Sequence, residues 1–127
     1  MKNILVDSSV WIQYFRNGTD PFSVHLHQLI QQNRVILTGV TEMEIYNGLR
    51  EKELNEIQSI FDLLQFAETT RNDFKTAGKV ITELRKNGKT IALSDALIAS
   101  VCINNDYELM TLDHDFDYIP NLAIHKN

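Results

Sequence analysis

Residues 3–16 read NILVDSSVWIQYFR, and this stretch decides the fold. Asn3–Asp7 is a short apolar run that ends in an acid, which is typical of a strand buried on both faces. In Ser8–Arg16 the apolar residues recur at helical spacing, and Asn17-Gly18 ends the segment. A buried strand that leads directly into a helix predicts a parallel sheet whose strands are joined by helical crossovers.

The same alternation continues along the rest of the chain. Further strands are predicted at 34–38, 65–67, 107–111 and 122–125, and further helices at 20–33, 41–49, 54–64, 71–86 and 94–104. No repeat, linker or low-complexity segment interrupts this pattern, so residues 1–127 are expected to form a single domain. The expected fold class is α/β, a three-layer α/β/α sandwich around a central, mainly parallel sheet.

The composition narrows the class of protein. The chain has 127 residues, of which 43% are hydrophobic and 23% charged, close to the average of globular domains. Twelve basic and seventeen acidic residues give a formal net charge of −5, which argues against a protein that holds nucleic acid by its overall charge. The single cysteine, Cys102, is expected to pack in the core. No apolar run is long enough for a signal peptide or a membrane span, so we expect a cytoplasmic protein without membrane contact.

Several acids lie where strands end. Asp7 closes the first strand and Asp113 follows the fourth, so both are expected in the crevice beyond the carboxyl ends of the strands. An acid that closes a buried strand needs a partner or a cation, and Asp7 therefore has no simple structural explanation. Five acids and no Lys or Arg lie between positions 106 and 117. For Asp106 and Glu108, a solvated loop is as good an explanation as a functional site.

Two further acids have structural alternatives. Asp95 follows Ser94, the expected N-cap of an almost wholly apolar helix, where an acid interacts favourably with the helix dipole. Glu44 completes the pattern Thr41-x-x-Glu44, which matches a capping box, and capping by itself is the better explanation of this residue.

Convergence of these four acids would favour a bound cation. Carboxylates crowded in a crevice raise each other's pKa unless a cation neutralises them, and few bases lie near them in the sequence. Oxygen ligands select Mg²⁺ or Mn²⁺, and such an ion activates water for attack on a phosphodiester. The residues therefore predict a metal-dependent phosphodiester hydrolase.

Four blocks of the sequence resemble a known family. They are Asp7-Ser8-Ser9-Val10-Trp11-Ile12, Glu44-Ile45-x-x-Gly48-Leu49, Ser94-Asp95-Ala96-Leu97-Ile98-Ala99 and Thr111-x-Asp113-x-Asp115-Phe116. Their residues and their order resemble the PIN-domain ribonucleases, and the small size of the chain makes it most similar to the VapC-type toxins of bacterial toxin–antitoxin pairs. One departure is Ser8, where threonine is more usual, and serine keeps the hydroxyl.

The resemblance implies roles for the matching residues. The acidic quartet of the family corresponds to Asp7, Glu44, Asp95 and Asp113. These four would hold one or two Mg²⁺ ions, for which Mn²⁺ can substitute, and would carry catalysis. Asp115 matches a fifth acidic position that is a metal ligand in some members. The hydroxyl residues that would orient the carboxylates are Ser8, Ser9 and Thr111.

The resemblance also implies a substrate and partners. The family cleaves single-stranded segments of structured RNA, commonly tRNA or a ribosomal RNA loop, and attack by activated water would leave 5′-phosphate and 3′-hydroxyl ends. A VapB-type antitoxin would neutralise the enzyme by covering the acidic crevice, and the toxin would form a homodimer. The sequence contains no helix-turn-helix, so we expect the antitoxin, and not this chain, to contact DNA.

A group of basic residues provides a candidate RNA-binding surface. Arg71, Lys75 and Lys79 recur at i, i+4 and i+8 and so share one helical face. This face is either simply solvated or binds RNA phosphates, which would make RNA binding depend on salt. Trp11 and Phe15 are expected in the core rather than on a base-stacking surface.

Two other functions remain open. An inactive PIN-like domain that only binds a partner would have the same fold, and failure to bind a metal would favour it. A phosphoacceptor receiver domain has similar length and an acidic crevice, but it needs a second acid after its first strand, where this chain has Ser8 and Ser9. The four histidines are not spaced as a metal site, and the motifs of serine hydrolases and phosphate-binding loops are missing.

Overall fold

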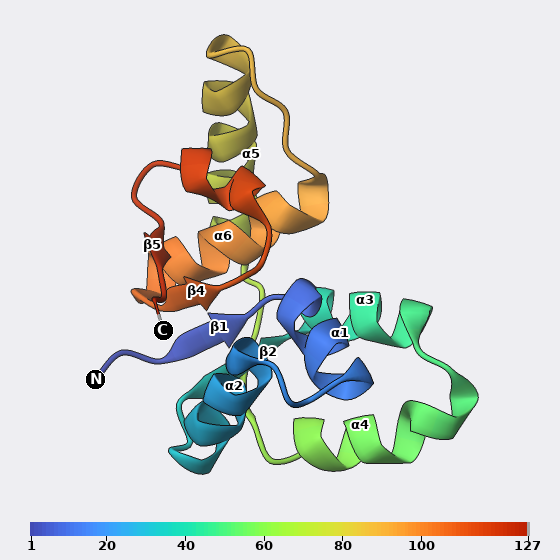
Figure 1. Cartoon of the computed structure of the whole chain (residues 1–127). Helices are drawn as coiled ribbons and strands as arrows, with labels where there is room; N and C mark the ends of the chain where they lie inside the picture. The colour runs from blue at the N-terminus through green and yellow to red at the C-terminus, as the bar shows by residue number, and fades with distance from the viewer. Residues whose placement is uncertain (127) are drawn as a thin grey trace.

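The computed structural model describes residues 1–126, with helices packed on both faces of one sheet (Figure 1). In chain order the elements are β1 (Ile4–Val6), α1 (Ser8–Arg16), α2 (Pro21–Gln31), β2 (Val35–Thr38), α3 (Gly39–Gly48), η1 (Glu51–Glu53), α4 (Leu54–Phe61), β3 (Gln65–Ala67), α5 (Arg71–Lys86), α6 (Leu93–Asn105), β4 (Glu108–Met110), η2 (His114–Tyr118) and β5 (Ala123–Ile124). Asn127 lies outside the described residues. No helix in residues 1–126 is long and apolar enough to cross a membrane.

The sheet places a topological switch point beside β1. Within residues 1–126 it has five strands in the order β3-β2-β1-β4-β5, and all neighbouring pairs are parallel. The predicted α/β class is therefore confirmed, with a wholly parallel sheet. The chain steps outward from β1 to β2 and β3, and β4 then pairs with the other side of β1. Ligands of open parallel sheets bind where the strand order reverses in this way.

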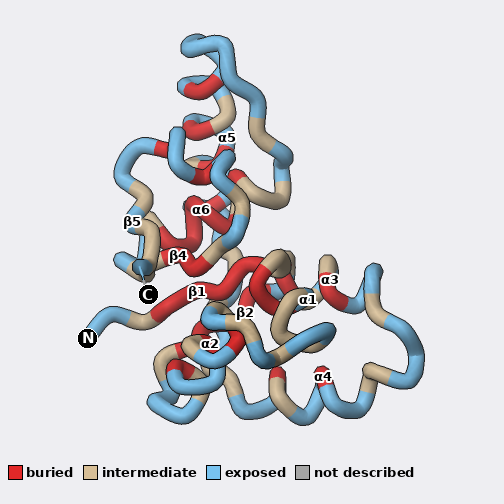
Figure 2. Tube along the Cα trace, in the orientation of Figure 1, coloured by how far each residue is buried: buried red, intermediate tan, exposed pale blue. Residues whose placement is uncertain are grey.

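Strand side chains alternate between two layers of helices. Ile4 and Val6 of β1 pack in a core with α1, α2, α3 and α4, whereas Leu5 between them packs with α5, α6 and η2. Figure 2 shows the buried part of the trace concentrated in the inner strands and α6. Trp11 is fully buried in the first core, with Phe15 stacked on it at 5.8 Å between ring centroids. The three-layer arrangement and the core position of Trp11 are thus confirmed.

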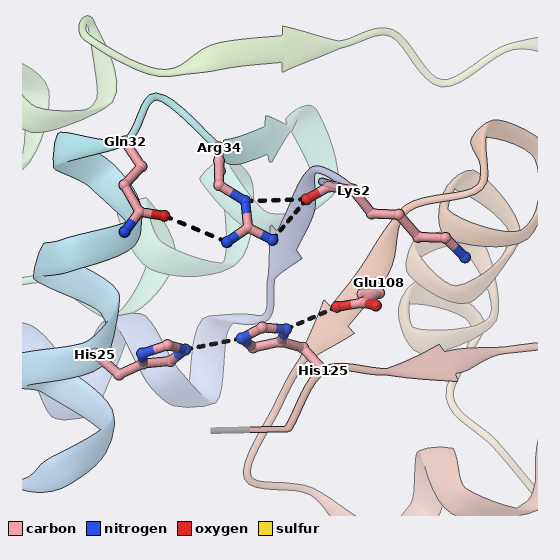
Figure 3. A network of polar contacts seen from close by, with 6 residues as sticks. All are labelled: Lys2, His25, Gln32, Arg34, Glu108 and His125. Atoms are coloured by element: carbon pink, nitrogen blue, oxygen red, sulfur yellow. Dashed lines mark hydrogen bonds and ion pairs between the residues drawn. The ribbon is translucent and has the colours of Figure 1, made fainter.

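Two histidines in contact connect the end of β5 to α2 (Figure 3). Nε2 of His125 lies 2.8 Å from Nε2 of His25, and the two rings are almost coplanar. Nδ1 of His125 lies 2.7 Å from Oε1 of Glu108 on β4. Beside them, Arg34 donates two hydrogen bonds to the carbonyl oxygen of Lys2, at 3.2 and 2.9 Å. These contacts hold the edge strand and the N-terminal segment against the rest of the fold.

Two helices begin earlier than the sequence predicts. α6 has Ala92 at its N-cap, so Ser94 lies inside the first turn and is not the cap. α3 begins directly after β2 and is capped by Thr38, whose Oγ1 accepts a hydrogen bond from the Thr41 amide at 3.3 Å. The alternative explanation of Glu44, a capping box with Thr41, is therefore wrong, because Glu44 lies beyond the first turn of the helix.

Candidate active site

Asp7 is a firmly held acid at the switch point. It follows β1, is only 4% exposed, and its amide donates a hydrogen bond to the Met110 carbonyl of β4 at 2.9 Å. Its Oδ2 accepts hydrogen bonds from the hydroxyls of Ser9 and Thr111, each at 2.8 Å. These two hydroxyls fix the orientation of the carboxylate and connect the ends of β1 and β4.

The loop after β4 is shaped by further hydrogen bonds from the same residues. Oγ of Ser9 accepts from the Leu112 amide at 3.1 Å, and Oγ1 of Thr111 accepts from the Asp113 amide at 3.0 Å. Asp113 in turn caps η2, because its Oδ1 accepts from the Asp115 amide at 2.9 Å. This series of hydrogen bonds thus places two more acids, Asp113 and Asp115, beyond the carboxyl end of the sheet.

Glu44 approaches Asp7 from the layer that contains α3. Burial raises the pKa of Glu44, and the charge of Asp7 raises it further, whereas the hydroxyls of Ser8 and Ser94 lower it. Among the described residues, none donates a hydrogen bond to the buried Oε1 of Glu44. Ser8 therefore faces Glu44 while Ser9 holds Asp7. Ser94 also belongs to this site, a role that the sequence did not predict because Ser94 matched the position of a helix cap.

Asp95 approaches from the opposite layer, in the first turn of α6. Burial, together with the charges of Asp7, Glu44, Asp113 and Asp115, raises the pKa of Asp95 to about 6. Electrostatic influence of this kind requires proximity, so each of the other four carboxylates lies near Asp95. Within residues 1–126, no lysine, arginine or histidine forms an ion pair with any of them. Their roles as ligands stay a prediction.

The five acids, hereafter the carboxylate cluster, are neighbours but do not form a closed cage. In the described part of the chain, no three acidic, histidine or cysteine side chains are close enough together to enclose an ion. The carboxylate oxygens nevertheless fit a hard divalent cation, and no residue in 1–126 donates a hydrogen bond to the buried Oε1 of Glu44. Mg²⁺ usually keeps several waters and needs only one or two direct carboxylates, so an open cluster suits it.

An apolar recess of about 90 Å³ adjoins the cluster. Most of its lining is apolar, including Ile12 and Phe15 of α1, and Glu44 and Arg16 also line it. The site therefore combines an acidic centre with a small apolar surface beside it.

The predicted RNA-binding residues lie on the exposed surface of α5. Lys75 and Lys79 line a shallow recess on this helix, and no member of the carboxylate cluster lines it. RNA binding by Arg71, Lys75 and Lys79 stays a prediction.

Comparison with known proteins decides the family. The PIN-domain model matches residues 4–122. The chain belongs to the PIN-domain family. Ribonuclease VapC11 of Mycobacterium tuberculosis is 26% identical over 125 residues, which cover 94% of this chain and 93% of that protein. Ribonuclease VapC3 of Methanocaldococcus jannaschii is 36% identical over 98 residues, 76% of this chain and 95% of the relative. The resemblance predicted from the four blocks is confirmed.

Solved structures share the fold of this PIN domain. VapBC2 from Rickettsia felis, bound to a DNA fragment from its promoter, has a TM-score of 0.83 at 23% identity and covers 96% of both chains. DNA-bound VapBC from Salmonella typhimurium has a TM-score of 0.84 at 20% identity and covers 98% of both chains. The receiver-domain alternative is wrong, since the doubly wound sheet of that class has the order 2-1-3-4-5, whereas this sheet has the order 3-2-1-4-5.

Proposed function

We propose that this PIN domain is a VapC-type endoribonuclease toxin that hydrolyses RNA phosphodiester bonds with the help of a divalent cation. The observation that carries the proposal is the carboxylate cluster at the switch point, where within residues 1–126 no basic side chain pairs with the acids. The names of the similar ribonucleases support RNA as the substrate class.

Several residues of the carboxylate cluster would bind the cation together. The proposed ligands are Asp7, Glu44, Asp95 and Asp113, with Asp115 as a fifth candidate. When bound, Mg²⁺ or Mn²⁺ stabilises charge on the phosphodiester and supplies hydroxide at neutral pH. Ser9 and Thr111 hold Asp7 in one orientation, so this carboxylate needs no reorganisation. The unpaired Oε1 of Glu44 is an acceptor for a cation or for a water bound to it.

A VapB-type antitoxin is the proposed protein partner, and a homodimer the proposed assembly. The VapBC complexes that share the fold support this type of partner. The apolar recess beside Glu44 is a binding site that we propose for apolar side chains of the antitoxin tail. A segment bound there would also cover the carboxylate cluster, because Glu44 lines the recess. In this scheme the antitoxin contacts DNA, and the toxin acts in the cytoplasm on tRNA or ribosomal RNA.

A cleavage assay tests the proposed activity. We expect the purified chain to cut total tRNA or ribosomal RNA into discrete fragments in Mg²⁺ or Mn²⁺ but not in EDTA. Asp7→Asn should reduce the rate about 100-fold or more, since even the groups that orient metal ligands account for about 10–100-fold. Asp62→Asn is the matched control, because Asp62 is an exposed acid at the end of α4.

The fragment ends test how the bond is broken. Hydrolysis by water leaves 5′-phosphate and 3′-hydroxyl ends, which ligation and phosphatase treatment identify. Ends bearing a 2′,3′-cyclic phosphate would show attack by the ribose hydroxyl and would contradict the proposal. Equal cleavage by the wild type and Asp7→Asn would remove the cluster from the reaction.

A further inference from the structure

An acidic site that cuts RNA needs a basic side chain nearby, because each nucleotide of the substrate carries a negatively charged phosphate. The chain has a net charge of −5, and the segment that forms part of the cluster contains five acids between positions 106 and 117 without any Lys or Arg. The substrate strand is therefore repelled unless basic residues from another segment meet it beside the cluster.

Lys89 is such a residue, and its backbone is fixed. It follows Gly88, which has a φ of +75°, at the end of α5. The Lys89 amide donates to the Leu84 carbonyl at 2.9 Å, and the Gly88 amide donates to the Arg85 carbonyl at 3.0 Å. This pair of bonds is the Schellman motif, in which a glycine adopts the left-handed conformation. The side chain of Lys89 therefore starts from a well-defined position.

Lys89 contacts an exposed aromatic ring. Its Nζ lies 3.9 Å from the centroid of the Tyr118 ring, at the end of η2. Tyr118 is 56% exposed, so much of its side chain is accessible to solvent. The two residues combine the groups that single-stranded nucleic acids bind, a cation for the phosphate and a ring on which a base stacks.

The Lys89–Tyr118 pair adjoins the carboxylate cluster through Asp115. A recess of about 170 Å³ is lined by Lys89, Thr90, Tyr118 and Asp115, with Leu84 from α5. Asp115 also lies close enough to Asp95 for its charge to act on that carboxyl group. Asp115 therefore belongs to both the recess and the carboxylate cluster, so the two lie side by side.

We propose that Lys89 and Tyr118 form a subsite for a nucleotide of single-stranded RNA next to the bond that is cut. The ammonium of Lys89 binds a phosphate, and a base stacks on the face of the Tyr118 ring opposite the ammonium. The proposal rests on the proposed ribonuclease function. It differs from the predicted surface of Arg71, Lys75 and Lys79, because no acid of the cluster lines the recess that contains Lys75 and Lys79.

Binding of a labelled RNA tests the subsite. The probe is a fluorescein-labelled single strand of about 12 mixed nucleotides, within the range of about 4–16 that such proteins cover, measured by anisotropy in EDTA to prevent cleavage. The variants are Lys89→Ala, Lys89→Arg, Tyr118→Ala and Tyr118→Phe. Lys52→Ala is the matched control, because it removes the same charge from an exposed position on η1 that lines neither recess. Thermal melting shows whether each variant is folded.

We expect Lys89→Ala to weaken binding roughly tenfold and to reduce the slope of log Kd against log salt by about 0.7, the effect of one phosphate contact on a single strand. Tyr118→Ala should weaken binding to a similar extent without changing the slope, while Lys89→Arg and Tyr118→Phe retain binding. In Mn²⁺, Lys89→Ala should raise KM for tRNA cleavage more than it lowers kcat.

Three results would overturn the subsite while leaving the proposed function intact. One is Lys89→Ala behaving like Lys52→Ala, and another is full binding by a folded Tyr118→Ala, each with normal cleavage by the wild type. Failure of a cleaving wild-type chain to bind the probe would also overturn it. A wild-type chain that cuts no RNA in Mn²⁺ would instead contradict the ribonuclease function on which the subsite depends.

Discussion

The charge of Asp95 is poorly tolerated in the metal-free protein. The carboxyl group is half-buried in the first turn of α6, and burial together with the charges of Asp7 and Glu44 raises its pKa to about 6. Its position near the positive end of the helix dipole does not offset these effects. At neutral pH the folded protein therefore contains a repulsion that unfolding relieves.

Asp95→Asn should consequently stabilise the metal-free fold. We expect the free energy of unfolding in EDTA at pH 8 to rise by about 1 kcal/mol, a figure reduced for solvent screening because the group is only half-buried. The folded pKa lies above the unfolded value of about 3.9, so stability is greatest below that value and is lost as the pH rises through about 6. The advantage of the variant should thus be largest above pH 7 and small near pH 4.

Urea unfolding at pH 4, 6 and 8 measures this difference. Asp62→Asn, which removes an exposed charge, should leave the unfolding midpoint unchanged. A less stable Asp95→Asn at pH 8 would show that Asp95 makes a favourable contact in the metal-free state and is not repelled by its neighbours.

At the scale of elements, local signals predicted the strands and helices but not all of their ends. The apolar run of β1 and the amphipathic pattern of α5 lie in contiguous sequence, so both could be predicted. The start of α3 could not be predicted in this way, because Thr38 and Thr41 are both threonines that could be the N-cap of this helix. The choice depends on pairing of β2 with β3 as far as Thr38 and Ala67, which is a tertiary contact.

The candidate site shows the same division. Asp7 and Asp113 follow strand ends, and the rule that parallel strands share a carboxyl edge was sufficient to predict that both lie at the same crevice, whereas the roles of Ser9 and Thr111 were implied only by the family resemblance. The approach of Ser94 to Glu44 depends on how α6 packs beside α3, and no local pattern encodes it. The contact of His25 with His125 spans 100 residues and was missed for the same reason.

That histidine contact predicts a role for α2 in holding the C-terminal edge of the sheet. His25→Ala leaves Nε2 of the largely buried His125 without its partner, so we expect the free energy of unfolding to fall by about 1–2 kcal/mol. His27→Ala on the same helix is the control, because His27 is exposed and makes only a long contact of 3.4 Å to Tyr14. Urea unfolding compares the two variants, and equal midpoints would mean that the imidazole pair does not stabilise the fold.

At the scale of the whole molecule, the carboxylate cluster joins the two helical layers. Glu44 comes from α3 in the layer that packs on Ile4 and Val6, while Asp95 comes from α6 in the layer that packs on Leu5. Asp7 and Asp113 follow strands of the sheet between them. A cation bound by all four would neutralise repulsion between the layers and would bind the folded chain much more tightly than the unfolded one.

Metal should therefore stabilise the whole fold by linkage. At a free Mn²⁺ concentration 100 times its dissociation constant, the free energy of unfolding rises by about 2.7 kcal/mol, which raises Tm by roughly 5–15 °C for a domain of this size. We expect calorimetry to show this increase for the wild type, most of it to be lost in Asp7→Asn, and KCl at equal ionic strength to have little effect. An equal increase in Asp7→Asn would place the ion away from the cluster. No increase at millimolar Mn²⁺ in the wild type would favour the inactive PIN domain that only binds a partner. A cluster that holds no cation keeps its own repulsion and lacks the ion on which the proposed hydrolysis depends.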